Sequence, residues 1–406
     1  MTTTQSTGAG PLQRQLPPGV KDLFGSAARR LVRLSGALNA LFARWGYAPV
    51  LPPIFEYYDN LVAGYGPEHA AELYRLVDPQ GQLLALRPDL TVPIARIVAT
   101  KLADAPLPLR FSYVAPVFRY VEPQAGRQRE FWQAGAELIG AASADADAEM
   151  IALLVATLDE GLGLERFQIN LGHMGFLRAI LAETDVSPLE WALIQRAIDR
   201  KNRRSLEHEL TAAGLDGPPA DALLALPELW GGPQVLDRAD HLTPNREAAH
   251  AIARLRAVYE RLVAYGLGER ITLDLGEVRG MDYYTGVTFE TFAPGSGYAI
   301  ASGGRYDDLL AQFGAERPAV GFAVQLERAM LVLEQEQGSE PVPPPDALAE
   351  ACGHPECLAP IIQRRAQGQT IELDVLNHSP AELRAAAARR GIPEVLVCLR
   401  SGESGA

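Results

Sequence analysis

Two polar side chains stand four residues apart in the segment REFWQAGAELIG, where Gln133 precedes Glu137. Residues i and i+4 of a β-strand face the same side of a sheet, so both side chains can point into one pocket. An amide and a carboxylate together offer donors and acceptors to a small polar ligand. The alternative interpretation is that these groups make polar contacts within the sheet itself.

Three further segments add ionic groups and hydroxyls to this candidate site. Arginine can bind a carboxylate through two parallel hydrogen bonds, and a carboxylate can bind a cation. The segments LRPDLT, VFRYV and VRGMDYY supply the residues concerned, which are Asp89, Thr91, Arg119, Arg279, Tyr283 and Tyr284. As a full set, these residues favour a binding pocket over unrelated internal ion pairs.

Motifs of several common catalytic and cofactor sites are missing from the sequence. It has no GxxxxGK[ST] loop, no GxSxG turn and no HExxH helix. Cys352, His354 and Cys357 offer three metal ligands, but structural zinc normally takes four and no fourth is nearby. We therefore predict no catalytic residues, no metal and no cofactor, and interpret the Cys-His-Cys cluster as a turn before a helix.

The hydrophobic pattern indicates the elements that position the candidate residues. Apolar residues at helical spacing follow Ser26, a good N-cap residue, and predict a helix of about 20 residues that Gly46 ends. These apolar residues are Leu31, Leu34, Leu38, Leu41 and Phe42. A short strand is expected at 48–51. Residues 109–140 predict a long antiparallel hairpin whose connection, 122–128, contains proline and glycine.

Helices are expected at 144–162 and 246–265, and three strands within 271–304. A polar helical segment from about 176 to 245 indicates an inserted lobe. Hairpins with helices gathered around them are typical of the α+β class rather than of a regularly alternating fold. We therefore predict a mostly antiparallel sheet flanked by helices.

Three prolines in a row mark a boundary near the C-terminus, because they fit neither a helix interior nor a central strand. We expect a disordered arm at 1–16, a core at 17–338 that contains the lobe, and a linker at 339–346. A small C-terminal α/β unit at 347–406 completes the prediction, with a strand-helix-strand pattern built from strands at 371–377 and 394–400.

Composition narrows the functional classes. The chain has 406 residues and a formal net charge of −13. This charge argues against a basic surface that binds nucleic-acid phosphates, and hence against tRNA as a partner. No apolar run approaches the roughly 20 residues that span a membrane. Three cysteines are too few for a disulfide framework and favour a reducing cytoplasm. A basic cluster in the lobe is most simply a solvated helix face; it comprises Arg196, Arg200, Lys201, Arg203 and Arg204.

Four ordered segments resemble the core of class II histidyl-tRNA synthetases over about residues 17–335. They are LRPDLT, VFRYVEPQAGRQREFWQAGAELIG, VRGMDYYTGVTFE and GGRYDDLL…PAVGFAVQLER. The stretch GYAPVLPPIFE (46–56) resembles the first motif of that class, which implies a twofold homodimer. The resemblance also implies a class II synthetase-like fold and a histidine-binding role for the residues of the candidate site, which are Asp89, Thr91, Arg119, Gln133, Glu137, Arg279, Tyr283 and Tyr284.

The residues on the nucleotide side of the site, where the synthetases bind ATP, differ from the synthetase pattern. The family has Arg-x-Glu where this chain has Arg119-Tyr120-Val121, and Glu122 is displaced by one residue and would face the opposite side of a strand. Gln325 replaces a glycine and is expected to fill space that a nucleotide needs. The C-terminal unit of about 60 residues is also shorter than a typical domain of about 100 residues.

A histidine pocket that is kept beside a changed nucleotide site resembles the regulatory subunits of ATP phosphoribosyltransferase. That resemblance implies a hetero-octamer with a short catalytic subunit, a place in the first step of histidine biosynthesis, and feedback inhibition by L-histidine without catalysis by this chain. One alternative is a truncated but active histidine-activating ligase. Another is a histidine-binding protein of a different pathway.

Overall fold

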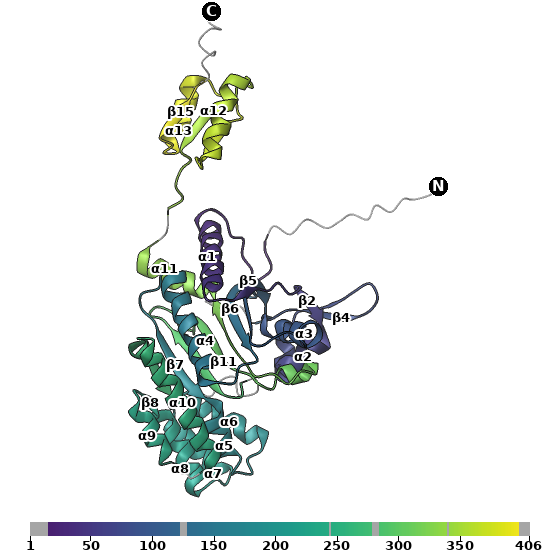
Figure 1. Cartoon of the computed structure of the whole chain (residues 1–406), viewed down its shortest axis with the longest axis vertical. Coiled ribbons are helices and arrows are strands. Elements are labelled where there is room, and N and C mark those ends of the chain that lie inside the picture. The colour runs from purple at the N-terminus through teal and green to yellow at the C-terminus, as the bar shows by residue number, and fades with distance from the viewer. Residues whose placement is uncertain (1–14, 122–127, 243–244, 278–283, 339–340, 398–406) are drawn as a thin grey trace, which may run out of the picture. The chain divides into compact units, whose positions relative to one another are not determined.

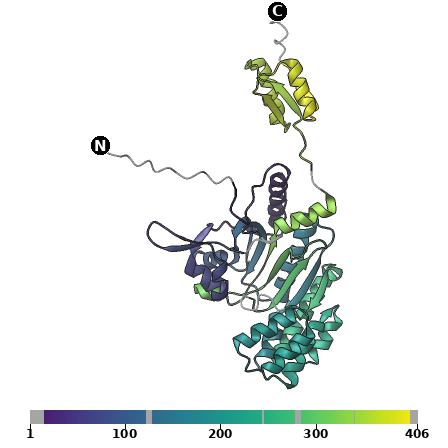
Figure 2. The same ribbon diagram turned by 180° about the vertical axis from the view of Figure 1, so that it is seen from behind.

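The computed structural model describes residues 15–121, 128–242, 245–277, 284–338 and 341–397. The chain forms two compact units, Met1–Gly338 and Ser339–Ala406, which are described separately (Figures 1 and 2). The arm predicted at 1–16 lies almost wholly outside the described residues.

A nine-stranded mixed sheet forms the centre of the first unit (Figure 1). Its strands lie in the order β1 (Ala48–Pro49), β5 (Leu109–Phe118), β6 (Glu130–Ile139), β12 (Ala319–Gln325), β11 (Ala301–Arg305), β10 (Val287–Phe292), β7 (Gln168–His173), β9 (Ile271–Asp274) and β8 (Trp230–Gly231). The pairs β1–β5 and β7–β9 are parallel, and the others are antiparallel. The predicted α+β class with a mostly antiparallel sheet is confirmed.

Four helices cover one face of this sheet and form the larger core. They are α1 (Gly25–Arg44), α4 (Ala144–Ala156), α10 (Arg246–Ala264) and α11 (Leu326–Gln337). The five apolar residues predicted for the first helix are its buried residues. Ser26 is not its N-cap, however, because the helix already begins at Gly25. Phe24 occupies the N-cap position and makes no side-chain hydrogen bond. A short π-helical turn at Thr157–Gly161 follows α4 where a continuous helix was expected.

The opposite face carries a smaller core and a three-stranded antiparallel sheet, β2 (Phe55–Tyr57), β4 (Leu83–Leu86) and β3 (Arg75–Val77). Helices α2 (Tyr58–Tyr65) and α3 (Thr91–Lys101) pack with it, together with 3-10 turns at Pro67–Glu72 and Leu310–Phe313. The polar residues of the candidate site lie on this face.

Five helices form a lobe between β7 and α10, at the lower end of the first unit in Figure 1. They are α5 (Met174–Leu181), α6 (Pro188–Asp199), α7 (Arg203–Ala212), α8 (Gly217–Ala225) and α9 (Gln234–Asp240). Their buried leucines and isoleucines join the larger core. Lys201 of the basic cluster pairs with Asp274 of β9 at 3.0 Å, so this lysine anchors the lobe rather than facing solvent alone.

The second unit is a parallel sheet in the order β14 (Ile371–Asp374), β13 (Ala347–Glu350), β15 (Glu394–Leu396) with helices α12 (Pro355–Ala366) and α13 (Pro380–Arg389). The sequence prediction missed β13. It also extended the first predicted strand too far, because Val375 and Leu376 lie beyond β14 and are exposed. A capping box of Ser379 and Glu382 is present at the start of α13.

The two described cysteines differ in state. Cys352 is free, whereas Cys357 is disulfide-bonded. No group of three metal-binding side chains occurs in the described parts of the chain. Among the helices described, none combines the length and the apolar character needed to cross a membrane.

Candidate functional site

Strand β6 divides its side chains between the two cores by simple alternation. Ala134, Ala136 and Leu138 belong to the helix-covered face, and Gln133 and Glu137 face the other way. The pattern of small apolar residues and polar residues on β6 therefore places both candidate groups on the same side, as the spacing predicts. They are 3% and 1% exposed, so neither is a surface residue.

A cavity of about 250 Å³ opens on this face. The candidate residues that line it are Asp89, Thr91, Arg119, Gln133 and Tyr284. Its other polar lining residues are Tyr65, His69, Glu72, Ser302 and Tyr306. Segments more than 200 residues apart in the sequence therefore meet at one site. Arg279 and Tyr283 lie outside the described residues.

Glu137 lies beneath the cavity and is held by three hydroxyl groups. Thr91 Oγ1 donates to its Oε1 at 2.8 Å, Tyr113 donates more weakly at 3.4 Å, and Tyr306 donates to Oε2. Burial raises the pKa of Glu137 to about 8, although these hydroxyls lower it. The nearby Asp89 charge adds to the rise in pKa. Glu137 is therefore largely protonated at neutral pH.

Two glycines make room for these groups on the sheet. Gly321 lies directly opposite Glu137, and a Cβ built on it would lie 1.6 Å from Glu137 Oε2. Gly304 is the next residue in the same row, and its Cβ would lie 2.7 Å from the ring of Tyr284. A strand glycine often marks a close approach of this kind. The row thus lets a carboxylate and an aromatic ring lie flat against the backbone.

The side-chain oxygen of Gln133 is available to accept a hydrogen bond. This atom, Oε1, is buried and has no hydrogen-bond partner among the described residues. A buried polar atom without a partner costs about 1–3 kcal/mol, so native structures rarely leave one unused. Since Gln133 also lines the cavity, a ligand donor can satisfy this atom.

Asp89 has a structural task as well as a place in the cavity wall. Its Oδ1 accepts the backbone N–H of Thr91 at 2.9 Å, at the start of α3. Burial raises the pKa of Asp89, while the nearby Arg119 charge and the Tyr65 hydroxyl lower it. The Asp89 side chain therefore holds the first backbone N–H of α3 with one oxygen and also forms part of the cavity wall.

Arg119 stands between this cavity and a second one. Its Nε donates to Pro88 O at 2.9 Å, and its guanidinium lies over the Phe131 ring, 5.5 Å from the centroid. It lines both cavities. A fixed cation at this position can pair with a carboxylate or a phosphate.

The second cavity, of about 220 Å³, occupies the nucleotide side of the synthetase pattern. Val121, Gln325 and Arg328 are among its lining residues. Gln325 contributes to the wall of this cavity, and its expected crowding of a nucleotide stays a prediction. Val121 supplies no polar group there, as expected from the missing glutamate. Glu122 lies outside the described residues.

Sequence reasoning missed the hydroxyls that surround Glu137, above all those of Tyr113 and Tyr306. Tyr306 belongs to the quoted segment GGRYDD, in which the two glycines of a strand were the available signal. Tyr113 alternates with Val114 on β5 and could have been placed on the site face from the hairpin register. Ser302 and Tyr65 carried no such signal.

The comparisons with known proteins agree with this fold. The family model described as Histidyl-tRNA synthetase matches residues 19–329, so the chain has the class II histidyl-tRNA synthetase fold. A solved structure from Bacillus halodurans, described as an ATP phosphoribosyltransferase regulatory subunit/histidyl-tRNA synthetase, is 30% identical with a TM-score of 0.83. The alignment covers 96% of this chain and 99% of that one.

Curated relatives narrow the assignment. The ATP phosphoribosyltransferase regulatory subunit of Desulforamulus reducens is 39% identical over 96% of this chain and 97% of that protein. The protein of the same name from Moorella thermoacetica is 41% identical over 95% and 98%. The chain belongs to the family of ATP phosphoribosyltransferase regulatory subunits.

Proposed function

We propose that this chain acts as the non-catalytic subunit that supports a short catalytic ATP phosphoribosyltransferase chain and senses L-histidine for feedback inhibition. The family assignment supports the regulatory role, which places the chain in histidine biosynthesis. The expected assembly is a hetero-octamer of the two subunits. The observation that supports histidine sensing best is the open buried acceptor of Gln133 in an ionic cavity.

The cavity offers each group that an amino-acid ligand requires. Gln133 Oε1 and the Asp89 carboxylate can accept from the ligand ammonium, and the Arg119 guanidinium can pair with its carboxylate. Glu137 and Tyr284 add a titratable group and an aromatic wall. The assigned set also includes Thr91, and it includes Arg279 and Tyr283 on the strength of their motif.

Calorimetric titration with histidine tests the sensing role. Gln133→Leu keeps the size of the side chain and removes the acceptor, so histidine affinity should fall about 5- to 150-fold, as for a lost buried hydrogen bond of about 1–3 kcal/mol. Gln168→Leu on β7 is the matched control, because that glutamine bonds Thr272 away from the cavity. Equal affinities for the two variants would refute this placement of histidine.

Reconstitution tests the partnership. The chain and a short catalytic ATP phosphoribosyltransferase from the same organism should co-purify, and transferase activity should rise on mixing. Histidine should inhibit the complex, and Gln133→Leu should make that inhibition weaker. Activity that is unaffected by this chain would contradict the regulatory role.

A histidine-activating ligase is the one competing function with an observation in its favour, since Arg119 and Arg328 both line the second cavity. Such an enzyme exchanges pyrophosphate with ATP in the presence of histidine. We expect negligible exchange, because Val121 stands where the synthetase pattern has the glutamate expected near the adenine. Exchange at the rate of an intact histidyl-tRNA synthetase would favour the ligase.

A further inference from the structure

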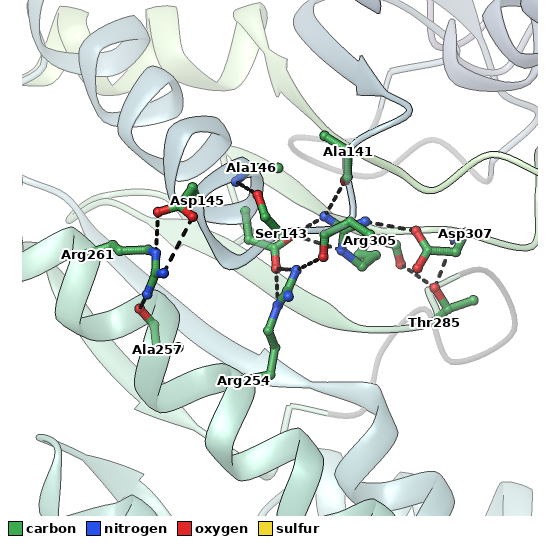
Figure 3. A network of polar contacts seen from close by, with 12 residues as sticks. Ala141, Ser143, Asp145, Ala146, Arg254, Ala257, Arg261, Thr285, Arg305 and Asp307 are labelled. Carbon is green, nitrogen blue, oxygen red and sulfur yellow. Dashed lines mark hydrogen bonds and ion pairs between the residues drawn. The ribbon is translucent and has the colours of Figure 1, made fainter. Parts of the chain in front are cut away.

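A buried ionic network lies between α4, α10 and the end of β11, on the helix-covered face of the sheet (Figure 3). Asp147 of α4 is fully buried, and its two oxygens bind different arginines. Oδ1 accepts from Arg305 at 2.9 and 2.6 Å, and Oδ2 accepts from Arg254 of α10 at 2.8 Å. One carboxylate thus joins a helix of the core, the end of β11 and the helix that follows the lobe.

Arg305 extends this network toward the cavity. Its Nη1 donates to Asp307 Oδ1 at 2.9 Å, and the backbone N–H of Asp307 donates to Thr285 Oγ1 at 2.9 Å. The backbone N–H of Thr285 in turn donates to the carbonyl of Arg305 at 2.7 Å. Thr285 is the residue after Tyr284, so the network fixes the segment that brings Tyr284 to the cavity.

The neighbours of Arg305 in the chain belong to the cavity itself. Gly304 lies under the Tyr284 ring, and Tyr306 donates its hydroxyl to Glu137. The Arg305 side chain binds Asp147 on the helix-covered face, while its neighbours face the site. A shift of this strand end would therefore displace both tyrosines together.

We propose that Arg305, held by the Asp147 carboxylate that Arg254 also binds, is a positioning residue for histidine binding: it fixes Tyr284 at the cavity and Tyr306 against Glu137 without touching the ligand. This inference rests on the proposed histidine site. It adds the helix face of the sheet, including α10, to the groups that determine histidine affinity. A change in the packing of α10 can thereby alter the cavity through the ion pairs of Asp147 with Arg254 and with Arg305.

Figure 3 also shows the matched control. Asp145 of α4 and Arg261 of α10 form an ion pair between the same two helices, but Asp145 is exposed, Arg261 is partly exposed, and neither reaches Arg305. Arg305→Lys and Arg261→Lys both keep the positive charge. Only Arg305→Lys removes guanidinium hydrogen bonds, to Asp147 and Asp307, that hold the strand end beside the cavity.

The experiment is histidine titration of the wild type, Arg305→Lys, Arg261→Lys, Tyr306→Phe and the double variant Arg305→Lys/Tyr306→Phe. We expect Arg305→Lys to weaken binding about 10-fold and Arg261→Lys to leave it unchanged. If Arg305 acts partly through Tyr306, the loss in the double variant should be smaller than the sum of the two single losses, because coupled residues are not additive. A merely structural role would give additive losses.

The outcomes separate this inference from the proposed function. No histidine binding by the wild type would overturn both. Wild-type binding with equal affinities for Arg305→Lys and Arg261→Lys, or with additive losses in the double variant, would overturn the positioning role alone. If Arg305→Lys does not fold, Thr285→Val replaces it, since it removes the Asp307 contact without burying a charge, and the same expectations apply.

Discussion

Glu137 is the residue whose environment departs most from that of an ordinary side chain in the site. It is 1% exposed, and within the described parts of the chain three hydroxyls rather than a cation contact its carboxyl group. Hydroxyls stabilise the ionised form less than a paired guanidinium would, so burial dominates and raises the pKa. This carboxyl group therefore binds its proton more tightly in the folded chain than in the unfolded one.

The raised pKa of Glu137 predicts how stability depends on pH. Between the unfolded pKa of about 4.5 and the folded pKa of about 8, the folded state holds more protons, so the free energy of unfolding falls as pH rises. One pKa unit corresponds to about 1.4 kcal/mol, which makes the loss a few kcal/mol. Urea unfolding at a series of pH values measures it.

Glu137→Gln should remove this pH dependence, because an amide does not titrate. Glu160→Gln, on the exposed partner of Arg44, is the control and should leave the dependence unchanged. A wild-type stability that is constant from pH 5 to 8 would show that Glu137 does not hold the proton.

At the scale of elements, individual glycines and arginines determine how neighbouring strands and segments pack together. Arg87 is 4% exposed, and its guanidinium donates to the carbonyls of Pro52, Pro53 and Pro116. Prolines have no N–H to pair in a ladder, so this arginine links the segment after β1 to β5 in place of strand pairing. The link also fixes the chain just ahead of Asp89.

Arg87→Met should lower the free energy of unfolding by about 2–3 kcal/mol, because one buried and two partly buried carbonyls lose a charged donor. Arg44→Met is the matched control, since its ion pair with Glu160 is exposed and should contribute less than about 1 kcal/mol. Thermal or urea unfolding of the two variants gives the comparison, and equal values would contradict the linking role.

Gly321→Ala should destabilise the sheet and abolish histidine binding, because the added methyl group meets both Glu137 Oε2 and the Ala136 carbonyl. Gly36→Ala, on the exposed side of α1 with nothing within 4 Å, should instead stabilise the chain by up to about 1 kcal/mol. Circular dichroism melting distinguishes the two signs. A stable Gly321→Ala variant with intact binding would refute the close approach.

Elements with strong hydrophobic periodicity could be predicted from the sequence. Elements that depend on contacts between distant segments could not. The leucines of α1 and the 109–140 hairpin were predictable because local spacing sets them. Strand β13 was not, because its four residues lie between a proline segment and a turn, and only pairing with β14 and β15 defines it. Gln133 and Glu137 followed from alternation, whereas the hydroxyls around Glu137 come from segments with no periodic relation to it.

The whole molecule consists of units with separate cores. The first unit holds the two large clusters on either side of the nine-stranded sheet, and the second has its own small clusters around Leu348 and Ile361. A unit with its own core can fold without the rest of the chain. The cavity residues all belong to the first unit.

A chain that ends at Gly338 should therefore fold and keep wild-type histidine affinity within about twofold, because it retains both large cores. A single cooperative thermal transition and calorimetric titration are the measurements. Loss of histidine binding by a folded truncated chain would show that residues after 338 contribute to the site.

The isolated chain should form a twofold dimer through the surface around β1. Leu51 is 81% exposed, and Phe24 and Phe55 add further exposed apolar area, which an isologous contact would bury. Light scattering should give about twice 43.9 kDa. Leu51→Glu should give a monomer, whereas Leu189→Glu, on an equally exposed leucine of the lobe, should leave the dimer intact.

The protonated state of Glu137 has a consequence for the solution around the protein. When a ligand ammonium enters the cavity, its charge favours the ionised carboxylate, so the proton must leave for the solvent. Near pH 7 the release should approach one proton per site. Titrations in buffers of different ionisation enthalpy would then give different apparent heats for the same affinity, and histidine uptake would acidify an unbuffered sample.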